Sequence, residues 1–234
     1  MTASPRYAVY LVPPVTHPLW LAASTWLDRD PAAPPATWGP APVLRTEPWR
    51  YGFHATLKPP LRLAAGHSEA DLLATLQQLA QQHAPFELPP LQVDWLAGFL
   101  ALRPVQAIAP EHPAQQLADA AVRLLDVHRA PHTEAERQRY LSPGLNAAQR
   151  EHVLRWGYAH VFEHWRLHFT LTDRLDALPE LERTGLRATV ATHFAAALAM
   201  PCRIESLALF TEPAPGQPFV LSHRVPLGST PLPP

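Results

Sequence analysis

A six-residue stretch, Phe-His-Ala-Thr-Leu-Lys at residues 53–58, has a counterpart later in the chain, Leu-His-Phe-Thr-Leu-Thr at residues 167–172. In both stretches apolar residues alternate with polar ones, which is the period of a half-buried β-strand. Each stretch is therefore predicted to be a strand with its apolar residues packed inward and its other side chains on the opposite face. The residues predicted on that opposite face are His54, Thr56 and Lys58 from the first copy and His168, Thr170 and Thr172 from the second.

The elements that follow the two stretches repeat as well. After the first, the pattern predicts a helix at residues 69–83, capped by Ser68, and a hairpin of strands at 91–96 and 98–103. After the second, it predicts a long helix at 178–200 and strands at 204–211 and 219–225. The same order of strand, helix and hairpin occurs twice, which indicates two similar lobes.

We therefore expect an α+β fold of one bilobal domain over residues 1–234, with antiparallel sheets facing a central cleft and helices outside. The first-motif lobe would cover about 1–105, a helical insertion about 106–160 and the second-motif lobe about 161–234, and the lobes can exchange strands. Further expected elements are a strand at 6–12, helices at 17–28 and 113–127, short helices at 134–141 and 146–156, and a proline-rich surface loop or lid at 31–42.

Composition narrows the class of partner. A formal net charge of −1 gives no basic excess for a long nucleic acid, and no apolar stretch reaches the roughly 20 residues of a membrane span. The single Cys202 and the absence of a signal-peptide pattern predict a cytoplasmic protein. A small, locally recognised ligand is the expected partner, and the oligomeric state stays open.

The paired motifs suit phosphodiester chemistry. Such a reaction needs one group to accept a proton and another to donate one, and two histidines with ordinary pKa values near 6.5 can do both at neutral pH. Thr hydroxyls can donate hydrogen bonds to phosphate oxygens, and Lys58 can offset negative charge. Because the chain has 13 histidines, a single His-x-Thr tripeptide can occur by chance and is weak evidence for a catalytic site. The alternative interpretation is that both histidines simply lie on a sheet surface without a catalytic role. The prediction rests on the doubling of the motif in equivalent strands.

The chain resembles the 2H phosphoesterase superfamily, whose signature is two His-x-Thr/Ser-x motifs on opposing strands. It is most similar to the branch of DUF1045-like phosphonate-metabolism proteins. The resemblance is carried by Arg-Tyr-Ala-Val-Tyr at 6–10, Tyr-Gly-Phe-His-Ala-Thr-Leu-Lys-Pro-Pro at 51–60, Leu-Arg-Trp-Gly-Tyr at 154–158 and the run at 166–172. One departure is Ala159-His160, where this branch has Pro-Tyr.

The resemblance implies a metal-independent enzyme without cofactor that opens or hydrolyses a small cyclic phosphodiester, such as a ribose cyclic phosphate in phosphonate breakdown. It implies His54 and His168 as general acid and base, in an order that the sequence leaves open. Thr56 and Thr170 would bind the phosphate.

Further residues are candidates for substrate binding. Tyr7, Tyr51 and Tyr158 can stack on a sugar or donate a hydroxyl, although a Tyr usually packs with its tip in water. In the strand predicted at 6–12, either Tyr7 or Tyr10 would lie on the same face of the sheet as His54 and Thr56. We take Tyr7 as the candidate substrate-binding residue. Arg139, with its neighbour Arg137, lies on a predicted polar helix and could reach a second phosphate, or simply form a solvated helix face.

Two other function classes stay open. His160, Glu163 and His164 match the His-x-x-Glu-His pattern of a zinc hydrolase, and His168 would extend the same helical face. The alternation of residues 166–175 argues against this, because it places His168 on a strand. The second alternative is a non-catalytic module that binds a phosphate ligand in the same cleft.

Overall fold

The structure, a computed structural model, describes residues 4–228 of the chain. Its helices are α1 Pro18–Leu27, α2 Thr46–Tyr51, α3 Glu69–Gln81, α4 Pro113–Leu125, α5 Glu134–Tyr140, α6 Ala147–Trp156 and α7 Glu180–Leu198, with 3-10 turns η1 Pro35–Thr37, η2 Asp126–His128 and η3 Phe162–His164. The strands are β1 Arg6–Leu11, β2 Ala55–Leu61, β3 Phe86–Glu87, β4 Leu91–Leu96, β5 Phe99–Pro104, β6 Phe169–Thr170, β7 Arg203–Ile204, β8 Ser206–Glu212 and β9 Val220–Pro226.

Two antiparallel sheets organise the fold. One has the order β2-β1-β8-β9 and the other β4-β5-β6, while β3 and β7 form a short two-stranded ladder. Each motif strand shares its sheet with the hairpin that follows the other motif: β2 lies with β8 and β9, and β6 lies with β4 and β5. Both halves of the chain therefore contribute strands to both sheets. The predicted α+β architecture is confirmed.

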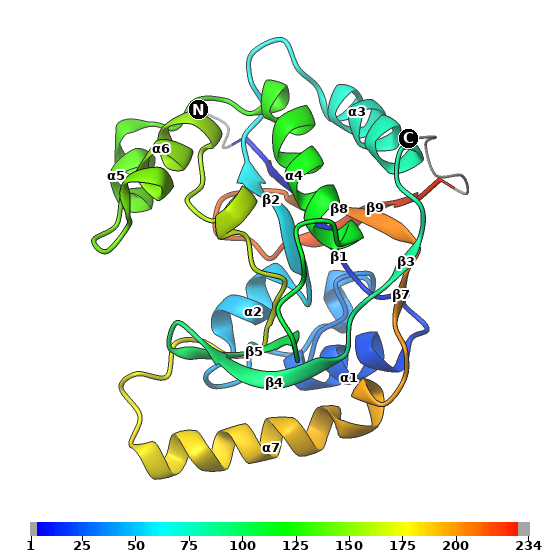
Figure 1. The fold of residues 1–234 in the computed structure, drawn as a ribbon, viewed down its shortest axis with the longest axis vertical. Coiled ribbons are helices and arrows are strands. Elements are labelled where there is room, and N and C mark those ends of the chain that lie inside the picture. Colours follow the sequence, from blue (N-terminus) through cyan, green and yellow to red (C-terminus); the bar gives the residue numbers. More distant parts are fainter. Residues whose placement is uncertain (1–3, 229–234) are drawn as a thin grey trace.

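Helices cover the outer faces of the sheets (Figure 1). Helices α3 and α4 pack on the four-stranded sheet, while α7 packs on β4 and against α1. A continuous apolar core joins the two sides, and in it Phe53 stacks on Phe169 with ring centroids 4.9 Å apart. Because these residues flank His54 and His168, the core holds the two motifs in a fixed relation.

Local signals explain several elements. Ser68 and Asp71 form the capping box that begins α3, as the sequence predicted. The hairpin β4–β5 turns at Ala97-Gly98, where both residues have positive φ, 47° and 89°. That conformation is the one a two-residue hairpin requires.

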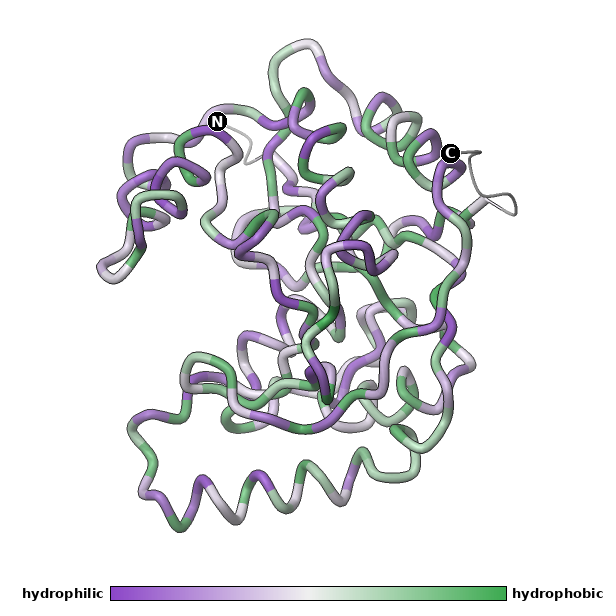
Figure 2. Tube along the Cα trace, viewed as in Figure 1, coloured by the Kyte–Doolittle hydropathy of each residue, from purple (hydrophilic) through white to green (hydrophobic). Residues whose placement is uncertain are grey.

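The inserted helices α5 and α6 form a hydrophilic projection (Figure 2). Helix α5 has no buried residue and α6 buries only Val153. Thr133 and Asn146 cap them with capping boxes. Local capping therefore fixes these helices more than packing does.

Two features differ from the sequence prediction. The second motif strand is shorter, because β6 pairs with β5 only at Phe169 and Thr170. Beyond it, the Leu171 amide still donates to the Leu100 carbonyl at 2.9 Å, but the Leu100 amide donates to the hydroxyl of Thr172 at 3.0 Å, so a side chain replaces one of the two backbone hydrogen bonds at this position. The second difference is α2, a six-residue helix between the proline-rich loop and β2. Within residues 4–228, every helix is too short or too polar to cross a membrane.

Candidate active site

A cleft of about 660 Å³ brings the two motifs together. It is lined from β1, α2, β2, the start of β5, α5 and the segments around the second motif. Its lining side chains are Arg6, Tyr10, Glu47, Pro48, Arg50, Tyr51, His54, Thr56, Pro59, Pro60, Phe99, Arg139, Tyr140, Tyr158, His168 and Thr170. The volume suits a small ligand. Residues of the loop at 31–42 do not line it.

The two histidines are oriented in the same way. Nδ1 of His54 lies 2.8 Å from the carbonyl oxygen of Gly52, and Nδ1 of His168 lies 2.7 Å from that of Arg166. A carbonyl oxygen only accepts hydrogen bonds, so Nδ1 must carry the proton in both rings. Nε2 of each neutral histidine is then left with a free lone pair. Each ring can therefore accept a proton at Nε2 or, once protonated, donate one from it.

Both rings favour the neutral form in the ligand-free protein. Burial lowers the pKa of His54 to about 4, with a further lowering from the charge of His168 and an opposing effect of the Gly52 carbonyl. Burial also lowers the pKa of His168, against the opposing hydrogen bond to Arg166. Both rings line the same cleft, so the charge of one disfavours protonation of the other.

Most of the predicted site residues do meet here. Thr56 and Thr170 both line the cleft with the histidines, and so do Tyr51, Tyr158 and Arg139. Burial raises the pKa of Tyr158 to about 12, so its hydroxyl stays protonated and can act as a donor. Arg137, by contrast, pairs with Glu134 and does not line the cleft.

The expectation that Lys58 faces the cleft is wrong. Tyr10 lies opposite Thr56, but Val9 lies opposite Lys58, so one step along β1 corresponds to two along β2. This irregularity reverses the alternation of β2 after Thr56. Lys58 consequently lies on the side of Val9 and is fully buried away from the cleft. Thr172, four residues after His168 as Lys58 is after His54, is also buried.

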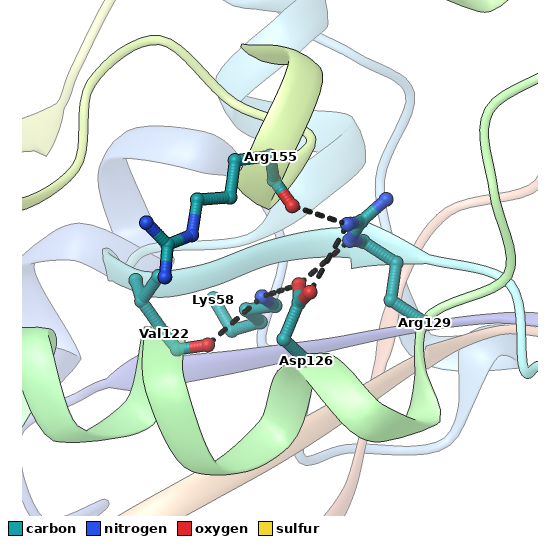
Figure 3. Close-up of polar contacts among 5 residues, drawn as sticks. All are labelled: Lys58, Val122, Asp126, Arg129 and Arg155. Atoms are coloured by element: carbon teal, nitrogen blue, oxygen red, sulfur yellow. Dashed lines mark hydrogen bonds and ion pairs between the residues drawn. The ribbon is translucent and has the colours of Figure 1, made fainter. Parts of the chain in front are cut away.

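The buried ammonium of Lys58 is held by helix α4 and the turn that follows it (Figure 3). Its Nζ donates to a carboxylate oxygen of Asp126 at 2.7 Å and to the Val122 carbonyl at 3.2 Å. Arg129 also binds Asp126 and reaches the carbonyl of Arg155. Burial lowers the pKa of Lys58 to about 8, although Asp126 opposes the shift. Lys58 therefore joins β2 to α4 and, through Arg129, to α6.

Tyr7 also lies outside the cleft, contrary to its assignment as a binding residue. It is buried in the core, and its hydroxyl donates to Glu69 of α3 at 3.2 Å. Tyr10 is the tyrosine of β1 that reaches the cleft, where its ring stacks on His54. Strand alternation places Tyr7 and Tyr10 on opposite faces of β1 but does not say which face lines the cleft, and the pairing of Tyr10 with Thr56 decides it.

Two arginines of the cleft were not predicted from the sequence. Arg6 and Arg50 both bind the buried carboxylate of Glu212, which the Gly216 amide also contacts at 3.0 Å. Burial acts to raise the pKa of Glu212, but these hydrogen bonds hold it below its ordinary value. The three charged residues come from β1, α2 and β8, so no local pattern could reveal them.

Arg139 differs from these two arginines. It is exposed, its guanidinium carbon lies 5.5 Å from the ring centroid of Tyr140, and it forms no ion pair within residues 4–228. Tyr140 is a further lining residue that was not predicted. Within residues 4–228, the cleft is thus lined by one arginine without an ion pair, Arg139, and by two that pair with Glu212.

The helical zinc ligand set proposed from the sequence is wrong. Val161 is extended, Phe162–His164 is a single 3-10 turn, and His168 follows an extended segment, so His160, His164 and His168 do not share a helical face. His160 does not join Glu163 and His164 in a group of metal-ligand geometry.

The fold and the cleft define an α+β protein with a two-histidine site between antiparallel sheets. A family model described as "Protein of unknown function (DUF1045)" matches residues 56–220, and the chain belongs to this family. The predicted resemblance to the DUF1045-like branch is thereby confirmed.

Relatives and solved structures add context. The chain is 43% identical over 226 residues to a protein of Laribacter hongkongensis and 38% identical over 231 residues to one of a Janthinobacterium species, both named ribose 1,5-bisphosphate phosphokinase PhnN. These matches cover 94% of this chain but only 51% and 50% of the relatives, so the chain spans about half their length.

Among solved structures, E. coli LigT complexed with 3'-AMP is 16% identical, with 96% of this chain and 98% of that chain covered and a TM-score of 0.43. Kluyveromyces marxianus Usb1 is 10% identical, with 94% and 99% covered and a TM-score of 0.36. Both likenesses are distant.

Proposed function

We propose that the cleft is the active site of a metal-independent phosphoesterase that opens or hydrolyses a small cyclic phosphodiester. The observation that carries the proposal is the matched pair of histidines. His54 and His168 line one cleft, and each has Nδ1 fixed on the carbonyl two residues earlier. Nε2 is thereby the atom that exchanges protons in both.

The proposed reaction uses one histidine as base and the other as acid. The neutral ring accepts a proton from water as the water oxygen attacks phosphorus. The protonated histidine gives its Nε2 proton to the leaving oxygen of the cyclic phosphate as the phosphorus–oxygen bond breaks. The product is therefore a phosphomonoester with a free hydroxyl. A bound phosphodiester anion favours protonation of the second ring, because an adjacent negative charge raises a histidine pKa. Thr56 and Thr170 donate hydrogen bonds to the non-bridging oxygens.

The arginines support a substrate with a second anionic group. Arg6 and Arg50 are partly neutralised by Glu212, whereas Arg139 forms no ion pair within the described residues. Guanidinium groups suit phosphate, which they bind through paired hydrogen bonds. We therefore propose a phosphorylated sugar whose cyclic phosphate lies at the histidines and whose second phosphate lies near Arg139.

The names of the relatives suggest which sugar. Opening a 1,2-cyclic phosphate of ribose 5-phosphate by cleavage at O2 leaves one phosphate on C1 and one on C5, which is ribose 1,5-bisphosphate. The chain has one lysine, Lys58, preceded by Leu57, and thus contains no GxxxxGK[ST] phosphate loop. We propose that the kinase named in the relatives belongs to the half that this chain does not match, and that the phosphoesterase supplies its substrate.

A chelator-treated assay tests the proposal. Ribose 1,2-cyclic phosphates with and without a 5-phosphate and nucleoside 2′,3′-cyclic phosphates would be compared for the parent, His54→Ala and His168→Ala. General acid–base catalysis predicts a loss of about 10² to 10⁴-fold in kcat for each variant. His223→Ala is a control outside the cleft. Binding without turnover of every compound by the parent would favour a non-catalytic phosphate-binding module instead.

A further inference from the structure

A second cluster of polar side chains lies outside the cleft. His152 of α6 meets Glu163 and His164 of η3, and the three potential ligand atoms lie within 4.8 Å of one another. Glu163 Oε1 is 3.6 Å from Nε2 of His152 and 3.6 Å from Nε2 of His164. In a tetrahedral zinc site with bonds of about 2.0 Å, ligand atoms are about 3.3 Å apart. Two of the three separations are therefore already close to those of a bound metal.

Two ring nitrogens of this cluster are buried without a hydrogen-bond partner among residues 4–228. They are Nε2 of His164 and Nδ1 of His152. A buried polar atom without a partner is costly and calls for an explanation. For His164 the orphaned atom is the one that points toward Glu163, so a cation between them would satisfy it.

The backbone between the two elements is strained in a way that favours the cluster. Phe162 has φ of 54°, in the left-handed region that side chains with a Cβ seldom adopt. Its ring packs against His152, Trp156 and the guanidinium of Arg123. This packing fixes the turn that places Glu163 and His164 opposite His152.

The surrounding charges are mixed. Asp119 of α4 is half-buried and has its pKa raised by burial and by the nearby charge of Glu163, while Gln115 and Arg123 oppose the shift. The two neighbouring carboxylates, Asp119 and Glu163, attract a cation. The positive charge of Arg123 partly offsets this attraction.

We propose that His152, Glu163 and His164 bind a divalent transition-metal ion, and that Zn²⁺ suits this set of two imidazoles and one carboxylate best. None of the three residues lines the cleft. The ion would join the C-terminal half of α6 to η3 and so fix residues 157–161, the segment that carries Tyr158 into the cleft. Its role is to position that segment, and the inference does not depend on the phosphoesterase reaction.

The geometry also indicates how tightly the ion binds. A histidine ligand is normally oriented by a hydrogen bond from its other ring nitrogen, and such partners raise metal affinity about 10 to 100-fold. In the part of the chain that the structure describes, Nδ1 of His152 has no such partner, and Glu163 is largely exposed. We expect micromolar rather than nanomolar binding, with water at the fourth position.

Thermal unfolding of the metal-free chain with added ZnCl₂ tests the site. Zinc at about 100 times its dissociation constant should raise Tm by about 5 °C. His164→Ala and Glu163→Gln should abolish this rise, and Glu163→Gln keeps the exposed side chain nearly the same shape, so its folding is not at risk. His223→Ala is the matched control, because His223 lies 3.3 Å from Glu69 without a second histidine. It should keep the full rise.

Two further measurements report on the ligands and on the segment. Co²⁺ in place of Zn²⁺ should give the strong visible absorption of a tetrahedral site in the parent and lose it in His152→Ala. Zinc should also slow hydrogen exchange of the amides at 157–161. A rise in Tm that persists in Glu163→Gln and His164→Ala, or no rise in the parent, would overturn the proposal. Unchanged exchange at 157–161 would remove the positioning role.

Discussion

The ring of Tyr10 stacks on the imidazole of His54, with centroids 3.7 Å apart and planes inclined by 21°. One side of the candidate catalytic ring is thereby covered by an aromatic face. His168 has no stacked partner of this kind among the described residues, and the ring of Phe99 lies tilted with its centroid 6.1 Å away. The two half-sites are thus alike in their Nδ1 hydrogen bonds but differ in what packs on the rings.

The stack predicts unequal effects of two substitutions. Tyr10→Phe keeps the covering ring, so kcat should stay within about twofold of the parent. Tyr10→Leu loosens His54 and admits water, so kcat should fall about 10 to 100-fold and the pKa of His54 should rise from about 4 toward its ordinary value, because the burial that lowers it is reduced. NMR titration of the imidazole C–H signals checks the pKa. An equal loss in both variants would implicate the hydroxyl instead.

The pH dependence of kcat/KM follows from the lowered pKa values of His54 and His168. The reaction needs one ring protonated and one neutral. In the free enzyme this state is most populated between the two macroscopic pKa values, and both lie below 6.5. We expect the maximum below pH 6.5 and a fall of about tenfold per pH unit on its alkaline side. A maximum at or above pH 7 would contradict the assigned environments.

Arg139 should discriminate between substrates. Loss of a charged hydrogen bond costs about 1.5 to 3 kcal/mol, or about 10 to 100-fold in affinity. Arg139→Ala should therefore raise KM by that factor for ribose 1,2-cyclic phosphate carrying a 5-phosphate, and leave KM for the compound without it nearly unchanged. Arg137→Ala is the matched control, because Arg137 lies on the same helix but pairs with Glu134. A similar rise in KM for both compounds would show that Arg139 does not bind the second phosphate.

The buried ion pair predicts a stability effect without an effect on the site. Asp126→Asn leaves the Lys58 ammonium buried without its carboxylate, which should lower the free energy of unfolding by about 3 kcal/mol. This value is at the low end for buried ion pairs because the Asp126 side chain is 21% exposed. Asp176→Asn, which breaks an exposed pair with Arg174, should cost less than about 1 kcal/mol. Urea unfolding measures both. Equal midpoints for the two variants would refute the role given to Asp126.

Local patterns were sufficient for much of the fold. Helix α3 was predictable because Ser68 caps it and apolar residues recur at helical spacing. The hairpin was predictable because Ala97-Gly98 separates two alternating runs. The two histidines were predictable because each lies just ahead of a strand in a repeated pattern.

What the sequence could not provide depends on non-local contacts. The irregular pairing between β1 and β2 is a property of two strands together, and it turns Lys58 away from the face of Thr56. Which face of β1 lines the cleft is also set by packing beyond the strand itself, so Tyr10 rather than Tyr7 reaches the cleft. The pairing of Arg6 and Arg50 through Glu212 spans most of the chain. His152 likewise meets its partners only after α6 has folded back toward η3.

The burial of Lys58 has a practical consequence. It is the only lysine in the sequence, and its ammonium lies between β2 and α4 with almost no exposure. Reagents that acylate side-chain amines consequently have no accessible lysine target while this contact is closed. The rate at which Lys58 is acylated therefore measures how often the strand and helix separate, which makes this residue a natural probe of local opening in the unmodified chain.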